Sequence, residues 1–373
     1  MSNDAETCPI FRRVGVLTGG GDCPGLNAVI RAVTMGCLNA DLEVMGIEDG
    51  FLGLAENRVR PLTVGDVGSI LNVGGTILGS NNKFNPRRAV VGKKPDGTLE
   101  HRDMMELCTN TLKVHGIEAV FVIGGDGTLT IANDFSSAGI PCIGIPKTID
   151  NDLVGTDITF GFMTAVATAT DAIDRVRTTA ASHHRVMVVE VMGRNAGWIA
   201  LHAGVAGAAH VILLPEIPFD TDAVARHVAA RRRRGRRHSI ICVAEGAKPI
   251  GGEKIIARVD PTSPDPIRLG GIGKFVADAI EKYTELESRY VVLGHVQRGG
   301  TPLPADRVLS TQFGHHAMCL LAQGRWNRMV ALQGGKLTDV PITEPAGKQR
   351  LVTIDDPLIA AARTVGTFFG EGA

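Results

Sequence analysis

The stretch "IPCIGIPKTIDND", residues 140–152, places two aspartates directly after a short apolar run. Residues 140–146 are typical of a buried strand, and Lys147, Asp150 and Asp152 then bring three charges to its end. Charged groups are costly to bury unless they are paired or bind a ligand, and a helix cap would need only one carboxylate. We therefore interpret the stretch as a strand with a polar site at its carboxyl end. The spacing predicts both aspartates on one side of an extended strand end.

Other apolar runs recur along the chain and alternate with stretches of helical period. They span residues 14–18, 43–47, 119–125, 185–193, 210–216, 239–246 and 289–300. Near-continuous apolar strands alternating with helices are typical of a parallel sheet covered on both faces. The sequence predicts an α/β fold with two doubly wound lobes and mainly parallel sheets covered by helices. It also predicts a helix over residues 100–116 and a Gly- and Pro-rich irregular insertion over 247–271.

The composition argues against several classes of function. In 373 residues, 39 Lys and Arg balance 39 Asp and Glu, and aromatic residues make up only 4%. Such a chain is a poor candidate for nucleic-acid binding. Its apolar windows fall short of the ~18 residues of a membrane span, and its amino-terminal segment lacks the apolar core of a signal peptide. The seven cysteines form no C-x-x-C pair, so we expect reduced thiols in a cytoplasmic protein.

Two glycine-rich segments follow predicted strands. "TGGGDCPGLNAV" (18–29) lacks the lysine of a Walker A loop and the third glycine of G-x-G-x-x-G, so it is equally consistent with a tight turn. "VIGGDGTLT" (122–130) places Asp126 among glycines where a helix begins, and amide groups there can face phosphate. A carboxylate oxygen suits Mg²⁺. The second segment therefore predicts phosphoryl chemistry without specifying the substrate.

Read in order, the strand-end segments resemble one family. They are "TGGGDCPGLNAVIR", "GGDGT" (124–128), "PKTIDND" (146–152), "SHHRVMVVEVMGR" (182–194), "AEG" (244–246) and "RYVVLGHVQRGGTP" (289–302). Together they resemble the phosphofructokinase family over residues 12 to about 325. NAD kinases and lipid kinases share "GGDGT" but not the rest. The resemblance implies a 6-phosphofructokinase, which in glycolysis transfers the γ-phosphoryl group of ATP to the 1-hydroxyl of fructose 6-phosphate.

The resemblance also implies a role for each site residue. Transfer to a hydroxyl needs a base, a metal on the phosphates, and cations or amides around the transferred group. Asp150 is the expected base, Thr148 and Arg194 assist it, and Asp126 is the expected Mg²⁺ ligand. The expected fructose 6-phosphate contacts are Thr148, Asp152, Arg185, Met192, Gly193, Arg194, Glu245, Arg289, His295 and Arg298. The expected phosphoryl-donor contacts are Gly20, Gly21, Lys83, Gly125, Asp126, Gly127, Thr128 and Lys147.

The domain and subunit organisation follows from the same resemblance. It implies a donor lobe formed by residues 1–160 and about 300–355, and a fructose 6-phosphate lobe formed by 161–299 with the insertion 247–271. In the family, the residues matching Arg185 and Arg289 reach in from a neighbouring subunit. A homodimer or homotetramer with shared active sites is therefore expected.

Two positions bear on the phosphoryl donor. Family members that use pyrophosphate typically carry aspartate where this chain has Gly127, and lysine where it has Lys147. Glycine leaves room for ATP, whereas an added lysine attracts anions without excluding ATP. The mixed pair resembles the longer, mixed-donor branch and favours ATP, with a pyrophosphate-dependent, reversible enzyme as the alternative. A non-catalytic regulatory subunit is a third hypothesis, but Asp126, Asp150 and Arg194 are all retained.

The arginine run "RRRRGRRH" (231–238) is predicted to be a solvated helix end, with contact to an effector phosphate as the alternative. The short bacterial enzymes of the family close an allosteric site with basic residues and a glutamate. Arg31 and Arg177 persist here, but Met35 replaces an expected arginine and His210 the glutamate. The sequence therefore gives little support to that form of regulation.

Overall fold

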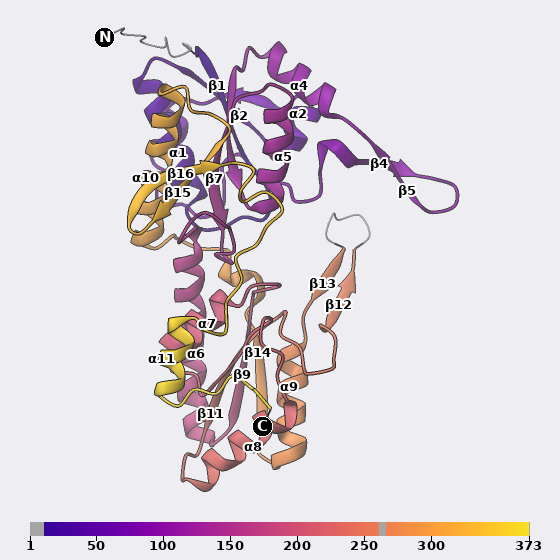
Figure 1. Ribbon diagram of the computed structural model, residues 1–373, viewed down its shortest axis with the longest axis vertical. Helices are drawn as coiled ribbons and strands as arrows, with labels where there is room; N and C mark the ends of the chain where they lie inside the picture. The colour runs from indigo at the N-terminus through magenta and orange to yellow at the C-terminus, as the bar shows by residue number, and fades with distance from the viewer. Residues whose placement is uncertain (1–10, 261–265, 373) are drawn as a thin grey trace.

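Two sheets lie one above the other along the long axis of the molecule (Figure 1). The structure is a computed structural model, and it describes residues 11–260 and 266–372. Cys8 and most of the amino-terminal segment lie outside the described residues. Most strand pairs in the two sheets are parallel and helices cover both faces, so the predicted fold class is confirmed.

The first sheet has eight strands. Seven run in the order β16 (Lys336–Pro341), β15 (Arg328–Gln333), β7 (Cys142–Thr148), β6 (Ala119–Gly124), β1 (Arg13–Thr18), β2 (Glu43–Ile47) and β3 (Val59–Pro61), and β8 (Phe160–Gly161) pairs with β7. β3 and β16, at the two edges, are antiparallel to their neighbours. Side chains alternate across β1, so that Val14 and Val16 pack in one core and Leu17 in another. Helices α1 (Leu26–Asn39) and α10 (Pro304–Ala322) cover the first core, whereas α2 (Phe51–Ala55), α4 (Met105–Val114) and α5 (Asp126–Ser137) cover the second.

The second sheet has four parallel strands. Their order is β10 (Val211–Leu213), β11 (Ser239–Ala244), β9 (Val186–Val191) and β14 (Ser288–Val292). Helices α6 (Phe162–His183) and α7 (Trp198–Ala206) cover one face, and α8 (Thr221–Arg233) and α9 (Ile272–Thr284) the other. β9 and β11 are buried along their whole length, as their apolar sequences require.

The chain returns to the second sheet at its carboxyl end. After β16 it runs down from the first sheet, and α11 (Pro357–Thr364) packs beside α7 (Figure 1). Phe368 then forms a parallel bridge with Val211 at the edge of the second sheet. We call residues 342–356 the crossing segment. It brings late residues of the chain close to both sheets.

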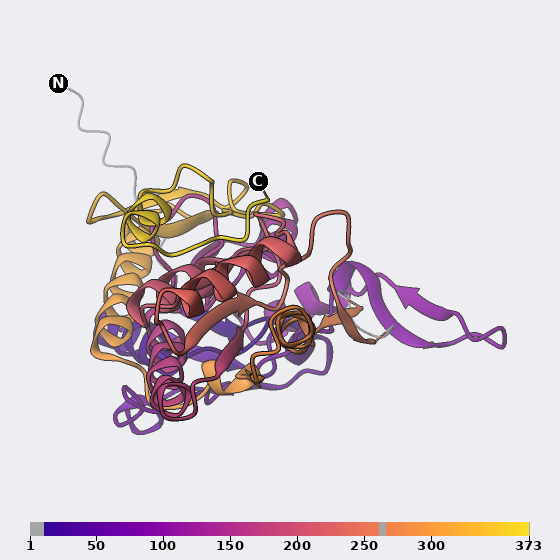
Figure 2. The same cartoon turned by 90° about the horizontal axis from the view of Figure 1, so that it is seen from below.

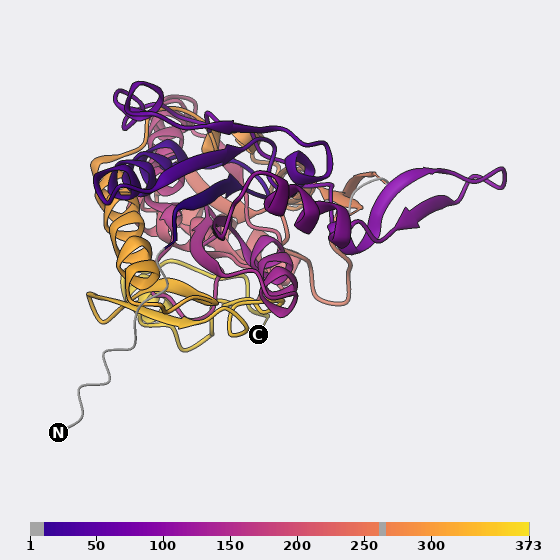
Figure 3. The same ribbon diagram turned by 90° about the horizontal axis from the view of Figure 1, so that it is seen from above.

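A two-stranded hairpin of β4 (Ala89–Lys93) and β5 (Leu99–Arg102) projects from the body (Figures 2 and 3). The prediction of a helix over residues 100–116 is therefore wrong at its start, because α4 begins only at Met105. Gly97 has a φ of 86°, and Asp96 accepts a hydrogen bond from the amide of Thr98, 2.9 Å away. This tight turn directs residues 99–102 back to pair with β4, so α4 cannot begin before them.

The insertion 247–271 contains a second hairpin, formed by β12 (Ile256–Val259) and β13 (Ile267–Leu269). The prediction of an irregular segment is wrong for these strands. Short runs with β-branched residues form them, although Gly and Pro residues on either side favour irregular structure. Residues 261–265 lie outside the described residues. Across the part of the chain that the structure describes, no helix is long and apolar enough to cross a membrane.

Candidate functional site

The loop after β7 carries the two aspartates of the opening stretch. Asn151, between them, has a left-handed backbone with a φ of 51°. Its side-chain oxygen accepts a hydrogen bond from the amide of Thr159, 2.9 Å away, and the hydroxyl of Thr159 donates to the carbonyl of Thr148 over 2.8 Å. The prediction of an extended strand end at Asp150 and Asp152 is therefore wrong, because the chain turns at Asn151, although the two carboxylates still lie near each other.

Asp150 lies where groups from both sheets meet. Its Oδ1 atom is buried and has no hydrogen-bond partner among the described residues. Burial raises the pKa of Asp150, the nearby cation Arg298 lowers it, and the carboxylates of Glu245 and Asp126 raise it further. Arg298 and Glu245 follow strands of the second sheet, whereas Asp126 follows a strand of the first. The structure thus brings four of the predicted site residues together.

Asp152 is the second carboxylate of this loop and is only 9% exposed. Burial and then the charge of Asp150 raise the pKa of Asp152 to about 7. Its Oδ2 atom accepts a hydrogen bond from the side-chain amide of Gln349, 2.9 Å away, in the crossing segment. The site therefore holds two acidic groups with raised pKa values, and the protonation of Asp152 can change near neutral pH.

The side chain of Thr128 accounts for two glycines of the glycine-rich segments without any bound ligand. A Cβ atom on Gly19 would lie 2.6 Å from the Thr128 side chain, and one on Gly124 would lie 2.3 Å from it. Gly127 differs, because a Cβ there would meet no atom of the described residues within 4 Å. Lys147 is buried and its ammonium donates to the carbonyl of Gly21, so a cation lies under the first glycine loop. Burial lowers the pKa of Lys147.

Asp126 begins helix α5, directly after Gly125. Among residues 11–260 and 266–372, the structure contains no group of three or more His, Cys, Asp or Glu side chains that could hold a metal ion. Mg²⁺ in phosphoryl-transfer sites usually has one or two carboxylate ligands, and phosphates and waters complete its coordination. The single carboxylate of Asp126, beside the open space at Gly127, fits Mg²⁺ bound in that way.

Residues of the second sheet face the same loop. Met192, Gly193 and Arg194 follow β9, and Glu245 follows β11. Burial and the nearby Glu190 raise the pKa of Glu245, whereas the cations Arg194 and Arg298 lower it. Glu245 is thus a common neighbour of both arginines.

Two hydrogen bonds fix the orientation of Arg194 and Arg298. The guanidinium of Arg194 donates to the carbonyl of Ile267 in β13, so it is directed toward the hairpin of the insertion. Arg298 follows the short helix η2 (Gly294–Gln297) and donates to the carbonyl of Asp22, 3.0 Å away in the first glycine loop. His295, within η2, is exposed. Arg298 thereby connects the two sheets at the site.

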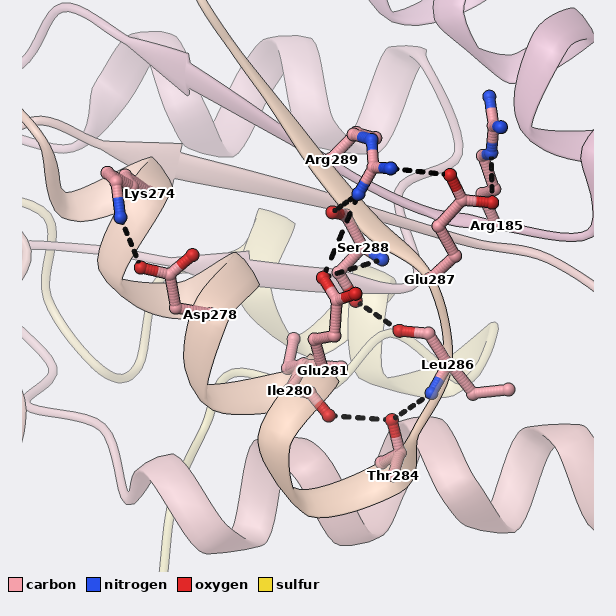
Figure 4. A network of polar contacts seen from close by, with 10 residues as sticks. All are labelled: Arg185, Lys274, Asp278, Ile280, Glu281, Thr284, Leu286, Glu287, Ser288 and Arg289. Carbon is pink, nitrogen blue, oxygen red and sulfur yellow. Dashed lines mark hydrogen bonds and ion pairs between the residues drawn. The ribbon is translucent and has the colours of Figure 1, made fainter.

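Arg185 and Arg289 lie apart from this cluster. Both bind Glu287, with Arg185 Nε and Arg289 NH2 each 2.6 Å from a carboxylate oxygen (Figure 4). Arg185 precedes the six residues of β9, whereas Met192 follows them, which separates the two ends by roughly 20 Å at about 3.3 Å per residue. A single chain therefore does not bring these two arginines to Asp150.

Lys83 forms an ion pair with Asp260, with Nζ and Oδ2 3.1 Å apart. Asp260 follows β12, so the hairpin of the insertion reaches the loop that carries Lys83. Sequence motifs gave no indication of Asp260 or of Gln349. Each meets its partner only through folding, since 177 residues separate Asp260 from Lys83 and 197 separate Gln349 from Asp152.

The arginine run lines a cavity at the other end of the second sheet. The cavity has a volume of about 460 Å³ and is lined by Arg177, His210, Arg231, Gly235, Arg236, Arg237 and His238. Residues 232–237 are exposed where α8 ends, so the prediction of a solvated helix end is confirmed, and the run also lines this cavity. Burial and the adjacent arginines lower the pKa of His210 to about 3, which keeps the imidazole neutral among these cations. Contact with an effector phosphate stays a prediction.

Comparison with known proteins gives a consistent result. A sequence model of the family described as Phosphofructokinase matches residues 13–321. The "ATP-dependent 6-phosphofructokinase" of Chloroflexus aurantiacus is 50% identical over 363 residues, covering 96% of this chain and 98% of the relative. The "Pyrophosphate--fructose 6-phosphate 1-phosphotransferase" of Streptomyces coelicolor is 48% identical over 360 residues, covering 96% and 100%.

Solved structures agree with these relatives. The chain resembles Pichia pastoris phosphofructokinase in the T-state with a TM-score of 0.77 and 31% identity, over 90% of this chain and 37% of that longer one. A pyrophosphate-dependent phosphofructokinase from Marinobacter aquaeolei has the same fold, with a TM-score of 0.78 at 20% identity over 97% of this chain and 92% of that one. The match extends across both sheets and includes every motif of the site, and the chain belongs to the phosphofructokinase family.

Proposed function

We propose that the chain is a 6-phosphofructokinase that transfers the γ-phosphoryl group of ATP to the 1-hydroxyl of fructose 6-phosphate. The observation that carries this proposal is the convergence of Asp126, Glu245 and Arg298 on Asp150. This convergence supports the roles we propose for these residues: metal ligand for Asp126, sugar-binding acid for Glu245, phosphate-binding cation for Arg298 and base for Asp150. Relatives about 50% identical over nearly their whole length bear the corresponding name.

Asp150 acts as the general base in this proposal. Its buried and unpartnered Oδ1 can accept the proton of the 1-hydroxyl, and its raised pKa brings its basicity closer to that needed at neutral pH. Thr148 orients the attacking hydroxyl, and Asp152 lies near Asp150. Arg194 rotates from the carbonyl of Ile267 toward the transferred phosphoryl group, where negative charge accumulates.

The donor side of the site is formed mainly by the first sheet. Mg²⁺ bound at Asp126 would neutralise phosphate charge during transfer. The glycine amides and the buried cation Lys147 hold the phosphates, and Gly127 leaves the open space that a nucleotide needs. The residues assigned to the donor are Gly20, Gly21, Lys83, Gly125, Asp126, Gly127, Thr128 and Lys147.

The fructose 6-phosphate side is formed by the second sheet. Met192, Gly193, Arg194 and Glu245 bind the reacting end of the sugar, and His295 and Arg298 bind further along it. Arg185 and Arg289 come from a neighbouring subunit, which is supported by their distance from Asp150 within one chain. The proposal therefore includes a homodimer or homotetramer. We also propose a donor lobe formed by residues 1–160 and about 300–355, and a fructose 6-phosphate lobe formed by residues 161–299. The enzyme is proposed to be cytoplasmic.

Pyrophosphate is the alternative donor, because Lys147 is present and a pyrophosphate-dependent relative is 48% identical. The deciding experiment measures formation of fructose 1,6-bisphosphate with Mg²⁺ and ATP and, separately, with Mg²⁺ and pyrophosphate. We expect turnover with ATP. Turnover with pyrophosphate alone would assign the alternative donor, and no turnover with either would reject the enzyme activity itself.

A further inference from the structure

The crossing segment reaches the catalytic loop although it lies beyond residue 321, where the match to the family model ends. Gln349 forms an isolated antiparallel bridge with Leu153. The amide of Arg350 donates to the carbonyl of Asp152, 2.7 Å away. The crossing segment therefore adds a short strand-like contact to the loop that carries Asp150 and Asp152.

The side chain of Gln349 joins this loop to the loop after β9. Its Nε2 donates to Oδ2 of Asp152 over 2.9 Å, and its Oε1 accepts from Nδ2 of Asn195 over 3.0 Å. Asn195 directly follows Arg194. A primary amide can donate on one side and accept on the other, which neither a carboxylate nor an ammonium group can do. Glutamine is thus chemically matched to both of its partners.

The backbone around Gln349 is held independently of its side chain. The guanidinium of Arg350 donates to the carbonyl of Asn151 over 2.9 Å and lies 4.6 Å from the ring centroid of Trp198. The amide of Val352 donates to Oε1 of Glu216, 2.9 Å away. These contacts fix the crossing segment against both sheets. The backbone that carries the Gln349 side chain is therefore held in place.

We propose that Gln349 is a positioning residue for phosphoryl transfer, which holds the Asp152 carboxylate at a fixed distance from the Asn195 loop and thereby sets Asp150 against Arg194. The inference rests on the proposed function and assigns to it a residue outside the family's motifs. The base and Arg194 follow strands of different sheets, and a displacement of about 1 Å in such a site can cost about 100-fold in rate. Gln349 connects the two loops that carry them.

The test compares Gln349→Ala and Gln349→Glu with the matched control Gln323→Ala, at the exposed end of α10. We expect kcat to fall by about 10- to 100-fold in Gln349→Ala, with the KM for fructose 6-phosphate changed less than about twofold. Gln349→Glu keeps the length and the acceptor for Asn195 but loses the donor and places a charge beside Asp152. It should be impaired at least as strongly, whereas a contact that only fills space would tolerate it.

A double-variant comparison with Asn195→Ala separates positioning from general stability. If the two residues act through one bridge, the double variant should lose little more activity than the worse single variant. Gln349 is exposed, so all variants should unfold near the temperature of the unaltered protein. Normal kcat in Gln349→Ala, full activity in Gln349→Glu, or fully multiplicative losses would each overturn the inference while leaving the proposed function intact. An unaltered protein without activity on either donor would instead remove the proposed function, and this inference with it.

Discussion

Lys83 and Asp260 form an ion pair between the loop that precedes β4 and the hairpin of the insertion. Half of the Lys83 side chain is exposed, at 51%, and an exposed pair of this kind contributes at most about 1 kcal/mol. If Lys83 also binds the donor phosphates, Asp260 competes for it. Asp260→Asn should then lower the KM for ATP by up to about fivefold, and Lys83→Met should raise it. Steady-state kinetics with varied ATP measures both, and an Asp260→Asn variant with a raised KM would argue against the competition.

Asp150→Ser tests the base. Turnover should fall at least ~100-fold with little change in affinity for fructose 6-phosphate, because the hydroxyl loses its proton acceptor while the sugar contacts remain. Asp278→Ser, on the exposed face of α9, is the matched control and should keep normal turnover. Normal turnover in Asp150→Ser would remove this residue from the mechanism.

Gly127→Asp tests the donor assignment. The added side chain enters open space, so the fold should be retained, but its carboxylate would occupy and repel the phosphate region of ATP. We expect the KM for ATP to rise by at least about 10-fold, equivalent to about 1.4 kcal/mol of lost binding, with the KM for fructose 6-phosphate unchanged. An unchanged KM for ATP would count against the steric argument.

The raised pKa values of Asp150 and Asp152 predict a pH-dependent turnover. Both carboxyls take up protons as the pH falls through their raised pKa values, that of Asp152 being about 7, so kcat/KM should decline on the acid side of neutrality. A pH profile that stays flat down to pH ~5 would contradict this, because an ordinary aspartate titrates near pH ~4. The profile of kcat/KM is measured with subsaturating substrate, because it reports the groups of the free enzyme.

Stability should change in the opposite direction. Between about pH 4 and 7 the folded protein binds a proton at Asp152 that the unfolded chain releases, so the free energy of unfolding should fall as the pH rises through this window. Asp152→Asn removes that dependence and should raise the melting temperature at pH 8 relative to the unaltered protein. A melting temperature that is lower at pH 8, with an unchanged slope against pH, would contradict the buried, proton-binding carboxyl.

Mixed oligomers test the shared active site. Asp150→Ser and Arg289→Ser subunits are each expected to be inactive alone. In a mixed pair one site has both residues intact, so random reassembly of dimers should restore about a quarter of normal activity. Activity that stays at the level of the separate variants after reassembly would exclude a contribution of Arg289 from the partner.

The sequence predicted the two-sheet fold because β1, β6, β7, β9 and β11 are mainly apolar and are buried along almost their whole length. Such strands need helices on both faces, and their carboxyl ends mark the site. The local turn at Asn151 could not be predicted, since it depends on hydrogen bonds from Thr159 and from the crossing segment. The hairpin β12–β13 was hidden by its glycine- and proline-rich surroundings.

Partners that are distant in sequence were the hardest to predict. Asp260, Gln349 and Lys254 carry no motif, and only the folded chain places them at the site. Lys254 donates to the carbonyl of Arg194 and to Oδ1 of Asn195, each 2.8 Å away. Motifs therefore indicated the side chains expected to act on the substrate. The side chains that orient those groups could be found only in the folded structure.

The late position of the crossing segment bears on how this enzyme is made. During synthesis, every motif of the family has left the ribosome well before Gln349 and Arg350 emerge. The earlier residues can form both sheets and the contact of Arg298 with Asp22 by then, but they lack the bridge through Gln349. Newly made chains should therefore reach full turnover only after residues 342–356 have emerged and packed beside Asp152.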